Sequence, residues 1–387
     1  MGVPRYTKDE RGRILQVEYQ SGLNVKIFYG PEDLERVGFT FIQNREDEMR
    51  TRSVFLGLVI GLISFCVVTA LATTGHAQEK QIKIRYVTQL PATHLLTQAE
   101  MKMAKMIEER SKGRVKVEVY PAGQLYKAME LLNAVMSGAV EMGTTPGAMF
   151  TGPVPLMDVF DIPLLLKDYG EVLKVWQGEP GDILRAQLEK IGIKTIGFSA
   201  YGENLSFCSH KPLTKPADFK GLKIRCNTNM GADLVKEFGA APVIFSSAEV
   251  YDALQRKTID AANSGVTSFV ERKWYEVTEQ ATLTWASYSV WPEMINLKFW
   301  NSLPKDIQQI ILDVGKEHQA YLLKETAKSD KEAVDFLKTK LKIYELTAAD
   351  IKTWMDAGRK PVVDAWLKRT GADGKKIMDW IDKNLKH

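Results

Sequence analysis

The sequence of 387 residues has few histidines and cysteines and lacks the common catalytic and phosphate-binding motifs. Its five histidines include no pair at the spacing of helical metal ligands, and no group of Cys and His has the spacing of a zinc site. The chain also lacks a G-x-S-x-G elbow, a G-x-x-x-x-G-K loop and a G-x-G-x-x-G turn. These absences favour a binding protein over an enzyme, and we expect no catalytic residue, metal ion or cofactor.

The sequence also has only a small net charge and no linker-like segment. The 52 basic and 48 acidic residues give a net charge of +4, and no run of lysines or arginines stands out. Nucleic acid is therefore not an expected partner. With 45% hydrophobic residues the chain can bury a sizeable core, and its length suggests about two domains. No internal repeat or Gly/Ser-rich linker separates them.

Residues 49–77 have the layout of a secretory signal. Arg50 and Arg52 precede an apolar run at Val54–Ala72, and small residues lead to a cleavage point after Ala77. The run is also long enough to cross a bilayer, so an uncleaved N-terminal anchor is the alternative. Either form exports the rest of the chain, which we expect in the periplasm.

The first 48 residues do not fit this layout, because signal peptides do not begin with a long tail of mixed charge. Met49 stands where a signal should begin. Residues 1–48 are therefore interpreted as an overlong assigned start or, alternatively, as a cytosolic tail of an anchored protein.

Strand and helix patterns alternate along the exported part. Strands are predicted at residues 81–89, 114–121, 191–199, 222–226 and 241–245, and another strand begins the stretch 342–371. Helices are predicted at residues 94–113, 127–138, 229–239, 246–260 with Ser247 as N-cap, 304–341 and the rest of 342–371. This alternation is typical of open α/β sheets.

The absence of linkers indicates two lobes joined by strands that cross between them. We therefore predict an α/β fold of the two-lobed, clamshell (type II-like) periplasmic-binding-protein class, with mixed sheets and long C-terminal helices. Lobe I is expected at residues 81–202 plus 291–330 and lobe II at 203–290 plus 331–387.

Several motifs then occur in a specific order: "SKGRVKVEVYPAGQL", "ELLNAVMSGAVEMG", "FDIPLLL", "PADFKGLKIR", "GAAPVIFSSAEVYDALQRKTIDA" and "WNSLP". Together they resemble the substrate-binding subunit of tripartite ATP-independent periplasmic (TRAP) transporters over nearly all of residues 81–305. The resemblance implies closure of two lobes on an organic acid. It also implies delivery of that acid to a separate membrane permease pair driven by a sodium gradient, and we expect the receptor itself to be a monomer.

In that family the arginine at the end of the "GLKIR" strand pairs with the ligand's carboxylate, and here it is Arg225. A guanidinium is always charged and offers two parallel N–H groups that match both carboxylate oxygens. Without the ordered motifs, an ordinary surface or inter-strand arginine would be the simpler interpretation.

Two departures from the family pattern affect the expected ligand. Leu205 stands close to where many members have another arginine, and "AANS" replaces the common "GQEN". Asn263 and Ser264 of that segment can still form hydrogen bonds with a ligand. The lost charge and added aliphatic side chain suggest a monocarboxylate with an apolar or aromatic body.

Other residues are weaker candidates for the ligand site. His94 could approach the ligand or cap a helix, and Gln124 and Thr145 could face the cleft or form local backbone bonds. Tyr201 and Trp291, with Trp285, could wall the pocket or belong to the core.

The exported part contains two cysteines, Cys208 and Cys226, which could form a disulfide in an oxidising compartment. The resemblance makes their stretches near neighbours, and two separately buried thiols are the alternative. Two other functions are also open: a membrane-anchored ligand-binding sensor, suggested by the apolar run, and an exported enzyme on the same scaffold.

Overall fold

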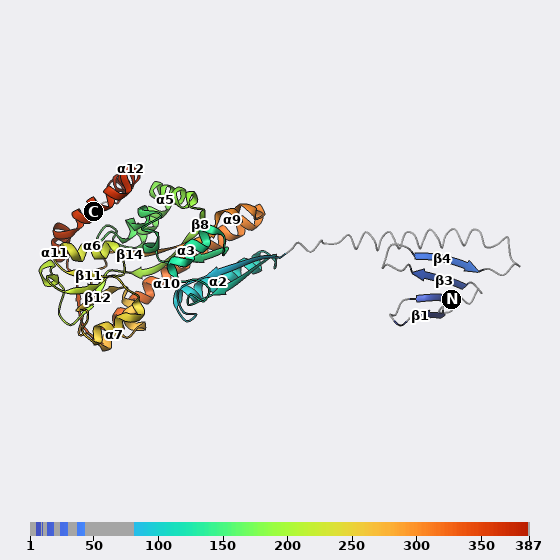
Figure 1. The fold of residues 1–387 in the computed structure, drawn as a ribbon, viewed down its shortest axis with the longest axis horizontal. Coiled ribbons are helices and arrows are strands. Elements are labelled where there is room, and N and C mark those ends of the chain that lie inside the picture. The colour runs from blue at the N-terminus through green and yellow to red at the C-terminus, as the bar shows by residue number, and fades with distance from the viewer. Residues whose placement is uncertain are drawn as a thin grey trace. The chain divides into compact units, whose positions relative to one another are not determined.

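The computed structural model describes residues 5–8, 10, 14–18, 24–29, 37–42 and 81–385 (Figure 1). The chain divides into two compact units, Met1–Glu79 and Lys80–His387. The first unit contains an antiparallel sheet of β1 (Arg5–Lys8), β2 (Ile14–Glu18), β3 (Asn24–Tyr29) and β4 (Val37–Ile42), in that order. The sequence patterns do not predict these strands. The expected signal or anchor at residues 49–77 lies outside the described residues.

The second unit contains two mixed sheets. The five-stranded sheet has the order β6 (Val115–Tyr120), β5 (Ile82–Val87), β7 (Met142–Thr144), β14 (Tyr288–Asn296) and β8 (Ile193–Glu203). Its first three strands are parallel, and β14 runs antiparallel to both β7 and β8. The predicted strands at 81–89, 114–121 and 191–199 correspond to β5, β6 and β8.

The six-stranded sheet has the order β11 (Ala241–Val243), β10 (Lys223–Arg225), β12 (Ala261–Ser264), β9 (Ser206–Ser209), β13 (Gln280–Leu283) and β15 (Lys342–Glu345). Parallel pairs join β10 to both β11 and β12, and β13 to β15, whereas β9 is antiparallel to both its neighbours. The central position of β12, between β10 and β9, brings residues from three distant segments together.

Helices cover these sheets (Figure 1). The longer ones are α2 (Leu95–Arg110), α3 (Ala128–Ser137), α4 (Tyr169–Gln177), α5 (Glu179–Lys190), α6 (Asn229–Glu237), α10 (Lys305–Leu337) and α12 (Lys360–Asn384). The shorter ones are α7 (Val250–Gln255), α8 (Val266–Glu271), α9 (Leu297–Ser302) and α11 (Ala348–Trp354), with short 3₁₀ turns between elements, including Pro155–Asp161 and Pro216–Phe219. The described residues contain no helix long and apolar enough to cross a membrane.

Local sequence explains where several helices begin and end. His94 caps α2, because its ring nitrogen Nδ1 accepts a hydrogen bond from the Leu96 backbone N–H at 3.1 Å. Gly138 ends α3 with a left-handed φ of 79°, a conformation that glycine adopts without steric cost. The predicted N-cap Ser247 is wrong by one residue: the side chain of Ser246 accepts the capping bond from Ala248.

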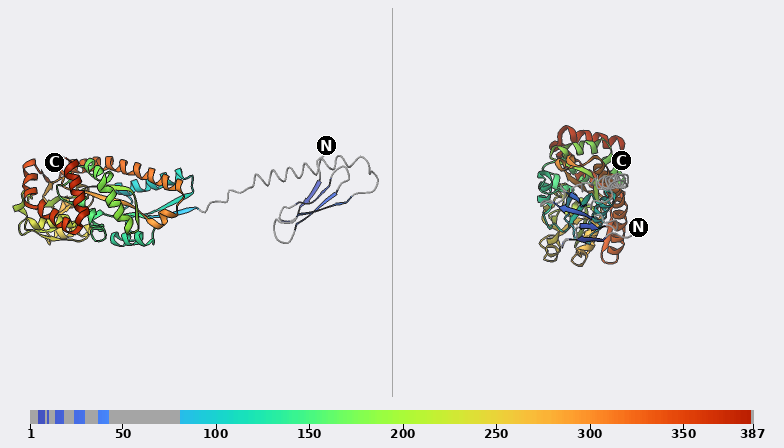
Figure 2. Two further views of the ribbon diagram at one scale, coloured as in Figure 1. Left: turned by 90° about the horizontal axis from the view of Figure 1, so that it is seen from above. Right: turned by 90° about the vertical axis from the view of Figure 1, so that its right-hand side faces the viewer.

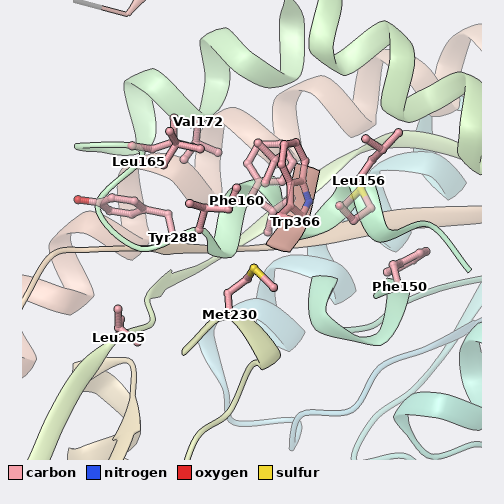
Figure 3. Close-up of a cluster of buried hydrophobic side chains, with 14 of the residues drawn as sticks. Phe150, Leu156, Phe160, Leu165, Val172, Leu205, Met230, Tyr288 and Trp366 are labelled. Atoms are coloured by element: carbon pink, nitrogen blue, oxygen red, sulfur yellow. The ribbon is translucent and has the colours of Figure 1, made fainter. Parts of the chain in front are cut away.

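Helix α10 has 33 residues and, coloured orange in Figure 2, runs along one side of this unit. It packs against β8, α2 and α8, so a single rigid element contacts segments attached to both sheets. A large apolar cluster also draws on both sheets. In Figure 3, Met230 of α6 points toward Trp366 of α12, whose indole N–H donates to the carbonyl of Pro155 at 2.9 Å.

Candidate functional site

Arg225 is the last residue of β10 and lies inside the six-stranded sheet, paired with Val243 on one side and Ala262 on the other. Its side chain is only 4% exposed. The guanidinium donates through Nε and Nη2 to the carbonyl of Phe245, at 3.2 and 3.1 Å, and through Nη1 to the carbonyl of Asn263 at 3.0 Å. Neutral backbone groups therefore hold the charge in place.

No Asp or Glu forms an ion pair with Arg225 within the described part of the chain, and burial lowers the pKa of its guanidinium to about 10. A guanidinium has five N–H groups, so two, one on each terminal nitrogen, have no acceptor among the described residues. A buried charge without a counter-ion is unfavourable unless an anion completes the site. Arg225 thus has, among the described residues, one unused N–H on each terminal nitrogen that a carboxylate could accept.

Asn263, on the adjacent strand β12, is fully buried, and its backbone carbonyl accepts the hydrogen bond from Arg225 Nη1. Its Oδ1 accepts a hydrogen bond from the Asn227 backbone N–H at 2.9 Å, whereas Nδ2 has no partner among the described residues. Ser264, the next residue, is 5% exposed. The Asn263 amide thus has N–H groups that are unused among residues 81–385 and that the surrounding residues cover.

An apolar side chain borders the free amide of Asn263. The position that a Cβ on Gly231 would occupy is 3.0 Å from Asn263 Nδ2 and 3.1 Å from Leu205 Cδ1. A larger residue at Gly231 would collide with both side chains. Leu205 thus lies close to the amide of Asn263.

Tyr201 lies in a stack of aromatic rings. Its ring is parallel to Trp291, with centroids 5.2 Å apart and planes at 3°, and it stacks on His94 at 5.9 Å and 7°. The Tyr201 hydroxyl is 2.6 Å from Ser268 Oγ on α8, directly after β12. The Tyr201 phenol also contributes electrostatically to the pKa of Arg225. Tyr201, on the five-stranded sheet, is therefore near enough to Arg225, on the six-stranded sheet, to interact with it electrostatically.

His94 is the cap of α2, so the helix-capping interpretation holds for this residue. Burial, followed by the positive charge of Arg272, lowers the pKa of His94 to about 4, which keeps the ring neutral near pH 7. Glu271 Oε2 lies 3.7 Å from its Nε2. The ring therefore acts as a neutral stacking surface for Tyr201.

Gln124 and Thr145 form no hydrogen bond with Arg225 within residues 81–385. Gln124 is exposed in the loop after β6, and Thr145 is buried, with Oγ1 donating to the Ala128 carbonyl at 3.2 Å. Local backbone bonding thus accounts for the side chain of Thr145. Both remain predictions as ligand residues.

Arg272, directly after α8, is not among the residues predicted from the sequence. Its charge lowers the pKa of both Arg225 and His94, and its Nε is buried without a partner among residues 81–385. Arg272 is therefore a second cation near the site. No local motif points to it, because its proximity to Arg225 depends on how α8 follows β12.

The proposed disulfide is wrong: Cys208 and Cys226 are both free and buried. Cys208 is on β9 and Cys226 follows β10, and β12 lies between these two strands. Strands two positions apart are separated by about 9–10 Å, whereas bridged α-carbons lie within about 7 Å. The alternative of two separately buried thiols holds.

We expect iodoacetamide to alkylate Cys208 and Cys226 in protein unfolded without reductant, as peptide mass spectrometry would show. Neither should react in the folded protein, since both thiols are buried and burial raises the pKa of each to about 12. Recovery of a disulfide-linked pair of peptides containing these residues would contradict the structure.

A buried polar cluster lies between β5, β8, β14, α2 and α10. Ser199 Oγ donates to Glu293 Oε1 at 2.5 Å, and His318 Nε2 is 3.0 Å from that hydroxyl and 3.3 Å from the same carboxylate oxygen. In a nucleophilic triad the histidine bridges the serine and the acid through different nitrogens. Here one nitrogen faces both groups, and Ser199 is fully buried, so the cluster is structural.

Glu100 also belongs to this cluster and is fully buried. Neither of its carboxyl oxygens has a hydrogen-bond partner among the described residues. Burial, followed by the charge of Glu293, raises the pKa of Glu100 well above its ordinary value of 4.5. The folded protein thus keeps a proton on Glu100 that the unfolded chain releases as pH rises. Stability is therefore lost as pH rises above about 4.5, up to the pKa in the folded state.

We expect Glu100→Gln to remove this loss, because an amide needs no proton to stay neutral. The variant should gain on the parent by about 1.4 kcal/mol per pH unit over the range in which folded Glu100 stays protonated. Urea unfolding at pH 5 and pH 7.5 measures the difference, with exposed Glu109→Gln on α2 as the matched control. Parallel pH dependences of parent and Glu100→Gln would show that Glu100 is ionised in the fold.

Comparison with known proteins gives the family. Residues 86–369 match bacterial extracellular solute-binding protein, family 7. The chain is 31% identical to the 2,3-diketo-L-gulonate-binding periplasmic protein YiaO of Escherichia coli, over 86% of this chain and 100% of that protein. It is 32% identical to the C4-dicarboxylate-binding periplasmic protein DctP of Rhodobacter capsulatus, over 84% and 97%.

Solved structures agree with this match. A TRAP periplasmic solute-binding protein from Desulfovibrio salexigens, with bound orotic acid, has a TM-score of 0.72 and 25% identity over 78% of this chain and 97% of that one. One from Sulfurospirillum deleyianum, with bound succinate, has a TM-score of 0.69 and 28% identity over 77% and 98%. The predicted α/β periplasmic-binding-protein fold is confirmed. The chain belongs to the bacterial extracellular solute-binding protein family 7, the solute receptors of TRAP transporters, which bind and deliver ligands and are not enzymes.

Proposed function

We propose that this protein is a periplasmic receptor that binds an organic acid through an ion pair between the ligand's carboxylate and Arg225. The observation that carries the proposal is a buried guanidinium that has no counter-ion and two unused N–H groups among residues 81–385. The relatives support it, since their names or bound ligands include C4-dicarboxylates, succinate and orotic acid. The receptor then passes the acid to the membrane permease pair of a TRAP transporter.

The ligand that fits best is a monocarboxylate with an apolar or aromatic body. Leu205 lies close to the amide of Asn263, and Tyr201, which is stacked on Trp291, interacts electrostatically with Arg225. A dicarboxylate is the second candidate, because Arg272 adds a second positive charge near Arg225. The two candidates differ in whether Arg272 contacts the ligand.

The clamshell arrangement is part of the same proposal, with lobe I at residues 81–202 plus 291–330 and lobe II at 203–290 plus 331–387. The strands of the five-stranded sheet come almost entirely from the first set, and those of the six-stranded sheet from the second. Export by cleavage after Ala77 is also proposed. Mass spectrometry of the protein recovered from periplasm tests it, since a start at Gln78 excludes the anchored sensor.

A thermal-shift screen of the full chain against organic acids tests the function, because a ligand that binds only the folded state raises the melting temperature. The panel should pair each acid with its neutral amide and each monocarboxylate with a dicarboxylate of similar size. We expect stabilisation by an acid and none by its amide. Stabilisation by an uncharged solute with no response to any acid would contradict the proposal.

A further inference from the structure

Within residues 81–385 the chain crosses between the five-stranded and the six-stranded sheet three times. The first connection is residues 204–205, between β8 and β9, and the second is residues 284–287, between β13 and β14. The third leads from β14 through α9 and α10 to β15. A change in the angle between the sheets has to bend or twist these connections, so groups that join them to one another restrict that angle.

One carboxylate joins the first two connections. Glu203, the last residue of β8, is fully buried. On the first connection and the start of β9, its Oε1 accepts a hydrogen bond from the Leu205 backbone N–H at 2.8 Å and its Oε2 accepts one from Ser206 Oγ at 2.7 Å. On the second connection, Oε1 accepts from Thr284 Oγ1 at 3.2 Å and from the Ala286 backbone N–H at 3.4 Å. Four donors from two distant segments therefore meet at one side chain.

Asp330 attaches α10, the third connection, to the same place. It is 4% exposed, and its Oδ2 accepts a hydrogen bond from the backbone N–H of Glu203 at 3.3 Å. Gly202 allows this close approach, since a Cβ there would lie 3.1 Å from Asp330 Oδ1. One helical turn earlier, Thr326 Oγ1 donates to the carbonyl of Ala200 at 2.8 Å. The long helix is thus fixed to the end of β8, directly before the first connection.

The second connection contains a strained residue. Trp285 has a φ of 49°, in the left-handed region that residues other than glycine rarely adopt. Its two neighbours, Thr284 and Ala286, are the residues that donate to Glu203, so the carboxylate holds this turn from both sides. Trp285 also lines a cavity of about 520 Å³ beside α10, which leaves space for the turn to move once it is released.

We propose that Glu203 is a positioning residue that fixes the angle between the two sheets by joining both strand connections to each other and, through its backbone, to α10. The inference rests on the proposed function, in which two lobes close on the ligand. Glu203 acts on the ligand site through Leu205, whose backbone N–H it binds and whose side chain lies close to the amide of Asn263.

Distances between two spin labels, measured by double electron–electron resonance on the full chain without ligand, test the proposal. One label is placed by Met129→Cys on α3, which packs against β7 and β14, and the other by Ile244→Cys, directly after β11. Both positions are exposed, and each reports on one of the two sheets. Cys66→Ser removes a competing thiol, whereas Cys208 and Cys226 are buried.

We expect Glu203→Gln to give a wider distribution of label distances than the parent, or an additional distance. The amide keeps the shape of the side chain but has no charge, and it turns N–H groups toward donors. Loss of hydrogen bonds to a charged group should raise the population of other sheet angles by about tenfold or more. Burial raises the pKa of Glu203 to about 7, so the measurement is made at pH 8, where most of this carboxyl is ionised.

Further variants decide the question even if Glu203→Gln does not fold. Thr284→Val removes one hydrogen bond from the second connection and should widen the distribution by less. Asp330→Ala removes the acceptor that holds α10 and should also widen it, whereas Asp330→Asn keeps an acceptor oxygen and should resemble the parent. Exposed Glu109→Gln on α2 is the matched control and should give the parent distribution.

The label distances separate a positioning role from a purely structural one. A residue that only stabilises the fold would change the free energy of unfolding and leave the distances in the folded protein unchanged. Parent-like distributions in Glu203→Gln, Thr284→Val and Asp330→Ala overturn the proposal. Because no ligand is present, this result is independent of the thermal-shift screen, whose failure would count against the proposed function alone.

Discussion

Replacing Arg225 with alanine is expected to weaken binding of the organic acid by on the order of 2–5 kcal/mol, or roughly 30-fold to several thousand-fold. The carboxylate loses its hydration on entering a buried site, which is tolerable only against a fixed opposite charge with matched hydrogen bonds. Arg225 is the buried cation that supplies both, since its remaining N–H groups are held by the carbonyls of Phe245 and Asn263. Calorimetry with the acid found in the thermal-shift screen measures the loss.

Arg225→Lys should recover only part of this affinity, because an ammonium keeps the charge but not the two parallel donors. Exposed Arg256→Ala, at the end of α7, is the matched control for removal of one positive charge and should leave affinity unchanged. Circular dichroism of each variant confirms that the fold is retained. If Arg225→Ala and Arg225→Lys both bind like the parent, another group holds the carboxylate.

Arg272 gives a related comparison that separates the two proposed ligand classes. If the ligand is a monocarboxylate, Arg272→Ala should weaken binding far less than Arg225→Ala, since only long-range attraction is lost. If it is a dicarboxylate, the two losses should be of similar size, because each arginine then faces one carboxylate.

Much of the fold can be predicted from local patterns. Alternating strands at 81–89 and 114–121, and the amphipathic helix that became α2, depend on side chains whose periodicity is visible in the sequence. The long helix α10 begins just after Pro304, as the position of that proline predicts. These elements are stabilised mainly by their own apolar faces, so local sequence identifies them.

Other elements depend on their neighbours and escape local patterns. Strand β12 reads "AANS" and has no alternation, yet it is fully extended because β10 and β9 pair with it on both sides. Strand β14 contains Pro292 near a register shift, a combination that weakens any prediction from sequence. Both strands carry residues near the candidate site.

The residues of the candidate site also differ in whether local sequence or only the fold reveals them. The ordered motifs predict Arg225 and Asn263 as ligand residues, which remains a prediction, and in the structure the Arg225 guanidinium donates to the Asn263 carbonyl. Cys208 and Cys226 are too far apart for a disulfide because β12 lies between β9 and β10, and the order of strands in a sheet cannot be inferred from their order in the sequence. Arg272 is close to Arg225 only because of the position of α8 in the fold, and the two residues are far apart in the sequence, so no local motif reveals their electrostatic interaction.

Trp354→Ala is expected to lower the free energy of unfolding by about 3–5 kcal/mol, the usual range for deleting a large buried aromatic side chain. Trp354 is fully buried at the end of α11, and its ring lies 5.2 Å from both Phe219 and Phe238 and 6.1 Å from Phe207. Its indole N–H donates to the carbonyl of Thr214 at 2.9 Å. The side chain thus attaches the C-terminal helices to the six-stranded sheet.

Trp354→Phe separates the two contributions, because it keeps most of the aromatic contact and loses the hydrogen bond and some volume. It should destabilise by about 1–2 kcal/mol. Exposed Lys352→Ala on the same helix is the control and should change stability by no more than about 0.5 kcal/mol. Urea unfolding followed by far-ultraviolet circular dichroism measures all three variants. A loss below about 1 kcal/mol for Trp354→Ala would mean that contacts of α12, including the hydrogen bond from Trp366 to Pro155, are sufficient to hold the C-terminal segment in place.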